Sequence, residues 1–421
     1  MVKMTPNIRS LLEAVFLLLI FSLGFMQPEI EFRGISLNVT EAIFIAACCL
    51  WLVAFFLKQV KIRWNPIYIL FGLYALGLFL SAAFSENSRT SFIKYLGELY
   101  LIGLAVLTFN VVDSERILKR VVFAWLAAST VTAFIGVVTV VMFYLGLESW
   151  VSAFALNGFG SLPPGNYPRI QSTFLYPAML CNYLTVGLMI LLAAYSVCWM
   201  RTLVCGILAS AFLLVIAFTL TPGIGGVMLA VGIWYWFLFK GRVKPFIAKL
   251  SLFAGIAAAV GFWLVSTFTV ISSPTSPFHF ELAGVRIDPT QRLLTWINAG
   301  QTFQAHRVMG KGLGLPVAQV YFMPPSGQLQ LLTDAHNFLL NVAAQAGLAG
   351  VVPLIMICVW FLSPRTYVRD DQNDTCAINL ALWIAFLSAF IYQGLVGSFE
   401  DARHLWVLMG LLTATSIPHR P

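Results

Sequence analysis

Charged residues are scarce in this sequence. Asp, Glu, Lys and Arg make up 10% of its 421 residues and hydrophobic residues make up 60%, whereas about a quarter of the residues of an ordinary soluble domain are charged. Apolar runs of about 20 residues recur along the chain, each long enough to cross a hydrocarbon core of about 30 Å as a helix. This composition excludes an ordinary soluble protein. It predicts an all-α polytopic membrane protein in which residues 1–421 form a single integral membrane domain.

The sequence also lacks the motifs that hold metals, nucleotides or disulfides. It contains neither D-x-D nor H-E-x-x-H, and its seven cysteines lie in or at the ends of apolar runs without metal-ligand spacing. The segment GKGLGLP at 310–316 matches neither the P-loop nor the dinucleotide spacing, and we interpret it as a flexible turn. We therefore expect no metal, no cofactor and no disulfide.

Twelve apolar segments predict twelve transmembrane helices. Because the number is even, both chain termini lie on the same side of the membrane. The segments span about 10–27, 39–57, 65–84, 92–111, 121–147, 173–199, 202–220, 224–239, 250–271, 337–362, 376–395 and 404–417.

Basic residues orient these helices, because loops rich in Lys and Arg stay in the cytoplasm. Of the 25 basic residues, 16 fall on the side that carries both termini, so the termini are predicted to be cytoplasmic. Membrane orientation explains most of the formal net charge of +8, and no nucleic-acid partner is expected. Seven arginines on the other side suggest an anionic ligand there: Arg33, Arg89, Arg169, Arg286, Arg292, Arg307 and Arg403.

One long polar interval, residues 272–336, interrupts the apolar sequence before the tenth predicted helix. It begins with a Pro-rich stretch that we interpret as irregular. It then becomes helix-like at residues 291–306, and we expect this helix to lie on the membrane. The apolar face of that helix is predicted to consist of Leu293, Trp296, Ile297 and Phe303.

Glu98 lies within an apolar segment, where an ionisable residue is a functional candidate. Its position near a helix end equally allows a purely structural hydrogen bond. The sequence leaves its role open.

Three motifs follow one another in residues 292–350: RLLTW at Arg292–Trp296, KGLG at Lys311–Gly314, and HNFLLNVAAQAGLAG at His336–Gly350. This arrangement resembles the O-antigen ligase and O-antigen polymerase superfamily. Its members share an R-x3-W element in a long periplasmic loop, a G-x-G turn and an HN-hydrophobic stretch that ends in G-L-x-G. The resemblance implies a glycosyltransferase of the bacterial inner membrane whose active site faces the periplasm.

Weaker similarities lie outside these motifs. RIQSTF at Arg169–Phe174 resembles the family's arginine element before a transmembrane helix, and FEDARHLW at Phe399–Trp406 resembles its segment near the last helix. Where many relatives carry S-R-G, this chain has TPGIGG from Thr221. An arginine that the family often uses for substrate phosphates is therefore missing, so another basic residue must replace it or the donor is held differently.

The resemblance implies a glycan donor attached to undecaprenyl diphosphate and an acceptor hydroxyl such as that of lipid A-core. Such an enzyme must hold and neutralise the pyrophosphate and aim the hydroxyl at the anomeric carbon. Arginine suits the first task, because its guanidinium stays charged and binds phosphate oxygens at two points. The predicted pyrophosphate-binding residues are Arg169, Arg292 and Arg403, followed by Arg286.

His336 suits the second task, because an imidazole with a pKa near neutrality can accept the proton of the attacking hydroxyl. The alternative is that His336 only caps the tenth helix or hydrogen-bonds within the loop. The residues predicted to support the site are Asp334, Asn337, Asp401 and His404.

The donor chemistry leaves the acceptor open. A ligase moves the finished polymer to lipid A-core, a polymerase adds a chain to the next lipid-linked repeat, and transfer to protein hydroxyls is a related possibility. We favour the ligase slightly, because the chain has one dominant periplasmic loop. A transporter is a further alternative, although the polar residues gather at one surface and no pair of broken helices in two repeats is evident.

Overall fold

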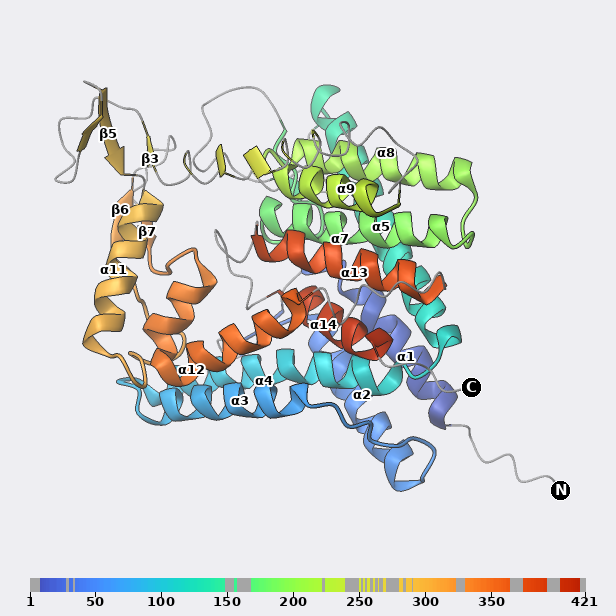
Figure 1. Ribbon diagram of the computed structural model, residues 1–421, viewed down its shortest axis with the longest axis horizontal. Coiled ribbons are helices and arrows are strands. Elements are labelled where there is room, and N and C mark those ends of the chain that lie inside the picture. Colours follow the sequence, from blue (N-terminus) through green and yellow to red (C-terminus); the bar gives the residue numbers. More distant parts are fainter. Residues whose placement is uncertain are drawn as a thin grey trace.

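The protein is a bundle of helices with a smaller strand-containing region at one end (Figure 1). The computed structural model describes residues 8–27, 30–32, 35–147, 155–156, 168–221, 224–238, 268–269, 280–282, 285–289, 291–322, 330–363, 374–391 and 402–416, and isolated positions between 250 and 264. The twelve helices of this part are α1 Ile8–Ser22, α2 Val39–Phe56, α3 Ile67–Ala83, α4 Ser88–Val111, α5 Glu115–Tyr144, α7 Pro177–Ser196, α8 Thr202–Phe218, α9 Ile224–Leu238, α11 Gln291–Ala305, α12 Phe338–Leu362, α13 Asp374–Ala389 and α14 Arg403–Ser416.

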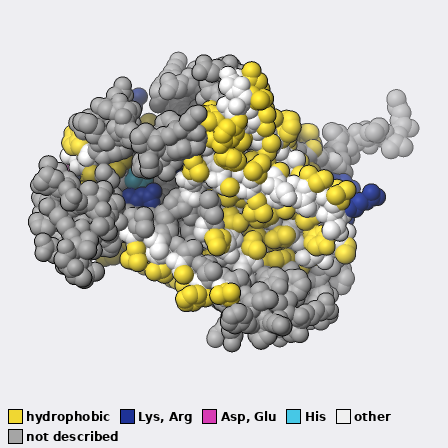
Figure 2. Space-filling view, turned by 90° about the horizontal axis from the view of Figure 1, so that it is seen from above, with side chains coloured by type: hydrophobic (Ala, Val, Ile, Leu, Met, Phe, Trp, Pro, Cys, Tyr) yellow, Lys and Arg dark blue, Asp and Glu magenta, His cyan; other side chains and the backbone are white. Residues whose placement is uncertain are grey.

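The helices confirm the predicted class, an all-α polytopic membrane protein. Five described helices are long and apolar enough to cross a membrane: α2, α4, α5, α7 and α12. Eleven of the twelve predicted segments coincide with a described helix, and the segment at 250–271 lies mostly outside the described residues. Phe268 and Thr269, predicted at the end of that segment as helix, form strand β3 instead. Many of the described side chains on the face seen in Figure 2 are hydrophobic, as a lipid-facing surface requires.

Close helix packing holds the centre of the bundle together. α3 runs beside α12. A Cβ atom added to Gly77 of α3 would lie only 1.9 Å from the carbonyl oxygen of Ala349 in α12. Small residues at such contacts let two helix backbones approach closely, which is how helices associate in a lipid environment. The position of α12 relative to α3 therefore depends on a glycine.

Short strands lie in the connections between helices. They are β1 Ile30–Phe32, β2 Ile35–Leu37, β3 Phe268–Thr269, β4 Phe280–Leu282, β5 Val285–Pro289, β6 Val320–Phe322 and β7 Gln330–Leu332. β1 pairs with β2, β5 pairs with both β3 and β4, and β6 pairs with β7, in each case antiparallel. The prediction of an irregular stretch is therefore wrong at 280–282 and 285–289. The alternation of Phe280, Leu282, Val285 and Ile287 with polar residues is the missed strand signal.

Candidate active site

The helix predicted within the long polar interval exists as α11, and its first turn carries Arg292. The face of α11 that packs against the protein carries Thr295 and Ala299, which are fully buried, whereas Ile297 of the predicted membrane-facing side is exposed. Thr295 explains this face, since its hydroxyl donates to the carbonyl of Arg292 at 2.8 Å and lies 3.4 Å from the carbonyl of Ala335. α11 therefore packs against the start of α12 and fixes Arg292 beside it.

Arg292 places a charged group in a largely buried position. Its Nη1 atom is buried and has no hydrogen-bond partner among the described residues. Burial lowers the pKa of its guanidinium, and the carboxylate of Asp334 acts in the opposite direction. A buried donor without a partner is unfavourable unless a ligand accepts its hydrogen bond.

His336 sits on a strained backbone between β7 and α12. Its φ of 46° lies in the left-handed region, which is uncommon for a non-glycine residue. Asp334 holds this conformation, because its Oδ1 accepts from the backbone N–H of His336 at 2.9 Å and lies 3.0 Å from the ring Nδ1. In the neutral ring Nδ1 must carry the hydrogen that faces this carboxylate, which leaves Nε2 free to accept a proton.

The environment lowers the pKa of His336 below its ordinary value. Burial is the largest cause, the carboxylate of Asp334 raises the pKa, and the positive charge of Arg292 lowers it again. The imidazole therefore stays neutral, and able to accept a proton, at more acidic pH than a free histidine does. Arg292, Asp334 and His336 thus act on one another electrostatically.

Asn337, and not His336, caps α12. Its side-chain oxygen accepts from the backbone N–H of Leu340 at 3.2 Å, and its carbonyl accepts from Asn341 at 2.8 Å. A capping residue satisfies N–H groups that a helix start otherwise leaves unpaired. The capping alternative for the His336 side chain is therefore wrong, whereas its hydrogen bond within the loop is present.

α12 is broken at Gly347, whose φ of 61° and ψ of −159° are not helical. The carbonyls of Ala344 and Gln345, which the break leaves without helix partners, accept from the backbone N–H groups of Lys311 and Gly312 at 2.9 and 3.0 Å. The predicted flexible turn at 310–316 is thus tied to α12 by hydrogen bonds. Its N–H groups at Lys311 and Gly312 are occupied, so they are not open to a phosphate.

Arg403 and His404 lie in a different cluster, at the start of α14. Arg403 Nη2 is 2.6 Å from Glu41 Oε1 of α2, and its guanidinium carbon lies 5.9 Å from the ring centre of Tyr100. His404 is buried, with Nε2 3.2 Å from Asn182 Oδ1 and its ring edge-on to Tyr183. Both side chains already have partners within the protein.

Sequence reasoning missed Glu41 as the partner of Arg403. Its only visible signal was its spacing from Asn38, which is typical of an ordinary helix start, and the two residues do form a capping box.

The structure also pairs Glu98 with Lys94 on α4, with 3.4 Å between Oε1 and Nζ.

Arg169 lies apart from the His336 region in the chain, at the entry to α7. The backbone N–H of its neighbour Ile170 donates to the carbonyl of Phe218 at the end of α8, at 3.0 Å. Thr221 follows Phe218 by three residues, and it begins the segment in which the arginine of the family's S-R-G turn is missing. Asp401 and the side chain of Arg286 lie outside the described residues.

In the view from above, a histidine side chain and a Lys or Arg side chain are visible beside each other (Figure 2). The described residues contain no group of three or more His, Cys, Asp or Glu side chains placed to hold a metal ion. Arg292, Asp334, His336 and Asn337 are the predicted site residues that the structure brings together.

Residues 205–355 match the family whose description is O-antigen ligase. The resemblance to the O-antigen ligase superfamily is confirmed. The matched region runs from α8 into α12 and includes the strands and α11 between them. Of the predicted site residues, it contains Arg286, Arg292, Asp334, His336 and Asn337.

The O-antigen ligase match supports a membrane enzyme of the ligase and polymerase type, which acts on lipid-linked glycans. Arg169, Arg403 and His404 lie outside the matched region. No curated protein matches the chain.

Proposed function

We propose that this protein transfers a glycan from undecaprenyl diphosphate to an acceptor hydroxyl, without a metal ion, at a site formed by His336, Asp334 and Arg292. The observation that carries the proposal is the hydrogen-bonded pair of His336 and Asp334 beside Arg292, whose buried Nη1 atom has no hydrogen-bond partner among the described residues. All three residues lie in the region that matches the O-antigen ligase family.

The chemistry requires one proton acceptor and one anion holder. The hydroxyl oxygen of the acceptor attacks the anomeric carbon of the donor sugar while the bond from that carbon to the pyrophosphate oxygen breaks. Nε2 of His336 takes the hydroxyl proton, and Asp334 keeps the ring in the required tautomer and stabilises the imidazolium that forms. The pyrophosphate leaves with its own negative charge, so no metal is needed if arginines neutralise it.

Arg292 is the first candidate for holding the pyrophosphate, because its buried Nη1 atom has no acceptor among the described side chains and backbone groups. Arg169 is the candidate to replace the missing arginine, since its backbone neighbour is bonded to the end of α8 just before Thr221. Arg286 remains a candidate from the sequence. Arg403 has the carboxylate of Glu41 as a partner, so it can bind phosphate only by leaving or sharing that contact.

The acceptor distinguishes a ligase from a polymerase. We favour lipid A-core as the acceptor and keep an O-antigen or exopolysaccharide polymerase as the second candidate, because the donor chemistry is the same in both. Deletion of the gene in its native host, followed by glycan gels, separates them. Long polymer retained on the carrier lipid indicates a ligase, and loss of all long chains indicates a polymerase.

The proposed enzyme lies in the bacterial inner membrane as one integral domain, with cytoplasmic termini and residues 272–336 in the periplasm. The contacts of α4 support a placement of the two ends of the bundle on opposite sides of the membrane. Ser91, near its start, donates to the carbonyl of Leu313, whereas Asn110 near its end accepts from Arg63 in a predicted cytoplasmic loop. Cysteine labelling should find residue 300 accessible from outside and residue 61 from inside. Labelling of residue 300 from the cytoplasm would remove the proposed site.

A further inference from the structure

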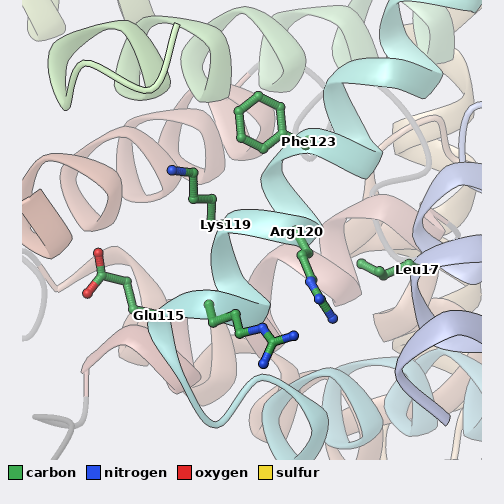
Figure 3. A pocket seen from close by; sticks show the side chains of 6 residues that line it. Leu17, Glu115, Lys119, Arg120 and Phe123 are labelled. Carbon is green, nitrogen blue, oxygen red and sulfur yellow. The ribbon is translucent and has the colours of Figure 1, made fainter. Parts of the chain in front are cut away.

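A pocket of about 630 Å³ opens between α1 and the first turns of α5. Figure 3 shows Lys119 and Arg120 projecting from α5, Phe123 one turn further along the same helix, and Leu17 of α1 on the side of Arg120. Arg116 and Glu115 complete the lining. The lining combines three cations and one carboxylate with an apolar wall of Leu17 and Phe123.

The cations of this pocket differ in whether a carboxylate of the protein compensates their charge. Arg120 Nη1 lies 3.0 Å from Glu13 Oε2, so its charge is compensated within the protein. Lys119 Nζ lies 5.1 Å from the ring centre of Trp199 and makes no ion pair with a described residue. Arg116 is exposed and likewise makes no ion pair within the described part of the chain. Two positive charges therefore remain available at the rim.

The pocket lies at the opposite end of the bundle from His336. α4 connects the two ends: Ser91 contacts the turn at 310–316, and α5 begins directly after the end of α4 at Val111. A helix rises about 1.5 Å per residue, so these ends of α4 are about 30 Å apart. That distance equals the thickness of a hydrocarbon core, which puts the pocket at the other membrane surface.

We propose that this pocket binds the headgroup of an anionic phospholipid from the leaflet opposite the candidate active site. Arg116 and Lys119 supply charge-assisted hydrogen bonds to the lipid phosphate, and Phe123 and Leu17 contact the first part of an acyl chain. Phe123 is 37% exposed, which fits a side chain that contacts lipid at the membrane boundary. A zwitterionic lipid lacks the net negative charge that two uncompensated cations favour.

The basic residues of a cytoplasmic loop also orient the protein in the membrane, and that role requires no pocket. The two roles differ in whether the exact positions of the basic residues matter. Orientation depends on the total charge of the loops, whereas lipid binding depends on the cations that line this pocket. A matched pair of variants separates them.

The test uses the full-length protein in a neutral detergent and native mass spectrometry to count retained phospholipid. The probes are phosphatidylglycerol, phosphatidylcholine and glycerol 3-phosphate, the last representing a soluble phosphate source. The pocket variant is Arg116→Gln with Lys119→Gln, and the control is Lys58→Gln with Lys61→Gln. The control removes the same charge from exposed residues of the same predicted side that do not line the pocket.

We expect the wild-type protein and the control to retain phosphatidylglycerol in preference to phosphatidylcholine, and the pocket variant to bind it on the order of tenfold more weakly. Arg116→Gln alone should weaken binding in the same direction. Because Arg116 is exposed, this single variant should fold even if the double variant does not. Equal retention of both lipids by the wild type, equal loss in pocket variant and control, or displacement of the lipid by glycerol 3-phosphate would each overturn the proposal. None of these outcomes depends on the activity proposed for His336.

Discussion

The structure contains two pairs, each made of an arginine and a histidine. The pairs differ in whether other residues of the protein supply the hydrogen-bond partners of these side chains. In the first pair, Arg403 contacts the carboxylate of Glu41 and His404 is buried against Asn182. In the second, Nη1 of Arg292 is buried without a partner among the described residues, and His336 is held on a strained backbone by Asp334. The same residue types therefore serve two environments, one complete within the protein and one left open.

This difference indicates where a ligand belongs. Packing and hydrogen bonds within the protein are sufficient to explain the first pair. In the second pair they leave the buried Nη1 atom of Arg292 without an acceptor among the described residues, and they hold His336 in a left-handed conformation, both of which are unfavourable in an empty protein. Strain and unsatisfied groups of this kind cluster at functional sites. We therefore propose that the chemistry takes place at Arg292 and His336 and that Arg403 and His404 have a structural role.

The largest expected effect separates the two histidines. His336→Ala should reduce glycan transfer by about a hundred- to ten-thousandfold, because the proton acceptor is lost. His404→Ala should instead lower thermal stability and abundance, since it leaves a cavity and removes the contact with Asn182 Oδ1, while each remaining folded molecule stays active. Transfer assays normalised to folded protein measure both variants. A His404 variant that folds normally but is inactive would break the comparison.

The next effect concerns the guanidinium of Arg292. Arg292→Ala should lower transfer by about ten- to more than a hundredfold, because a charged hydrogen-bonding partner of the pyrophosphate is lost. Arg292→Lys should fail to restore it, since a lysine cannot make a planar two-point contact. Transfer rates for the two variants, at matched protein levels, measure this. Full activity of the alanine variant would remove Arg292 from the site.

Gly347 tests whether the break in α12 positions the site. A Cβ atom there would lie 2.3 Å from the carbonyl oxygen of Val308, on a backbone with positive φ. Gly347→Ala should therefore destabilise the protein by about 1–3 kcal/mol and lower transfer. The matched control is Gly300→Ala in α11, where nothing lies within 4 Å of the added atom. It should raise stability by up to about 1 kcal/mol. Thermal unfolding of both variants gives the answer, and equal melting temperatures would contradict it.

The smallest effect concerns Arg403 and Glu41. If their contact is structural, Arg403→Gln, Glu41→Gln and the double variant should lose similar stability, with a coupling energy on the order of 1 kcal/mol. If Arg403 instead binds substrate, Arg403→Gln alone should lower transfer and Glu41→Gln should not. A double-mutant cycle, with unfolding and transfer both measured, distinguishes the two roles.

The sequence predicted the helices well, because apolar runs of membrane length are strong signals. Arg292 and His336 also emerged from short motifs in the right order. The sequence could not show that Glu41 pairs with Arg403 or that the Lys311 turn fills a break in α12. Each of these is a contact between residues far apart in the chain, and local patterns carry no information about such contacts. The burial of Thr295 through its contact with Ala335 is a further contact that local patterns do not show.

The pH dependence of transfer tests the central claim most directly. If His336 is the base, the wild-type rate should stay constant down to its ordinary pKa of 6.5 and fall only at lower pH, because burial and Arg292 lower that pKa. Asp334→Asn should move this fall to still lower pH, since its carboxylate raises the pKa of His336. His336→Gln keeps a hydrogen-bonding side chain but cannot accept the proton, so the rate should drop by about a hundredfold or more and the acidic fall should disappear. A His336→Gln enzyme with a near wild-type rate and an unchanged pH profile would contradict the account.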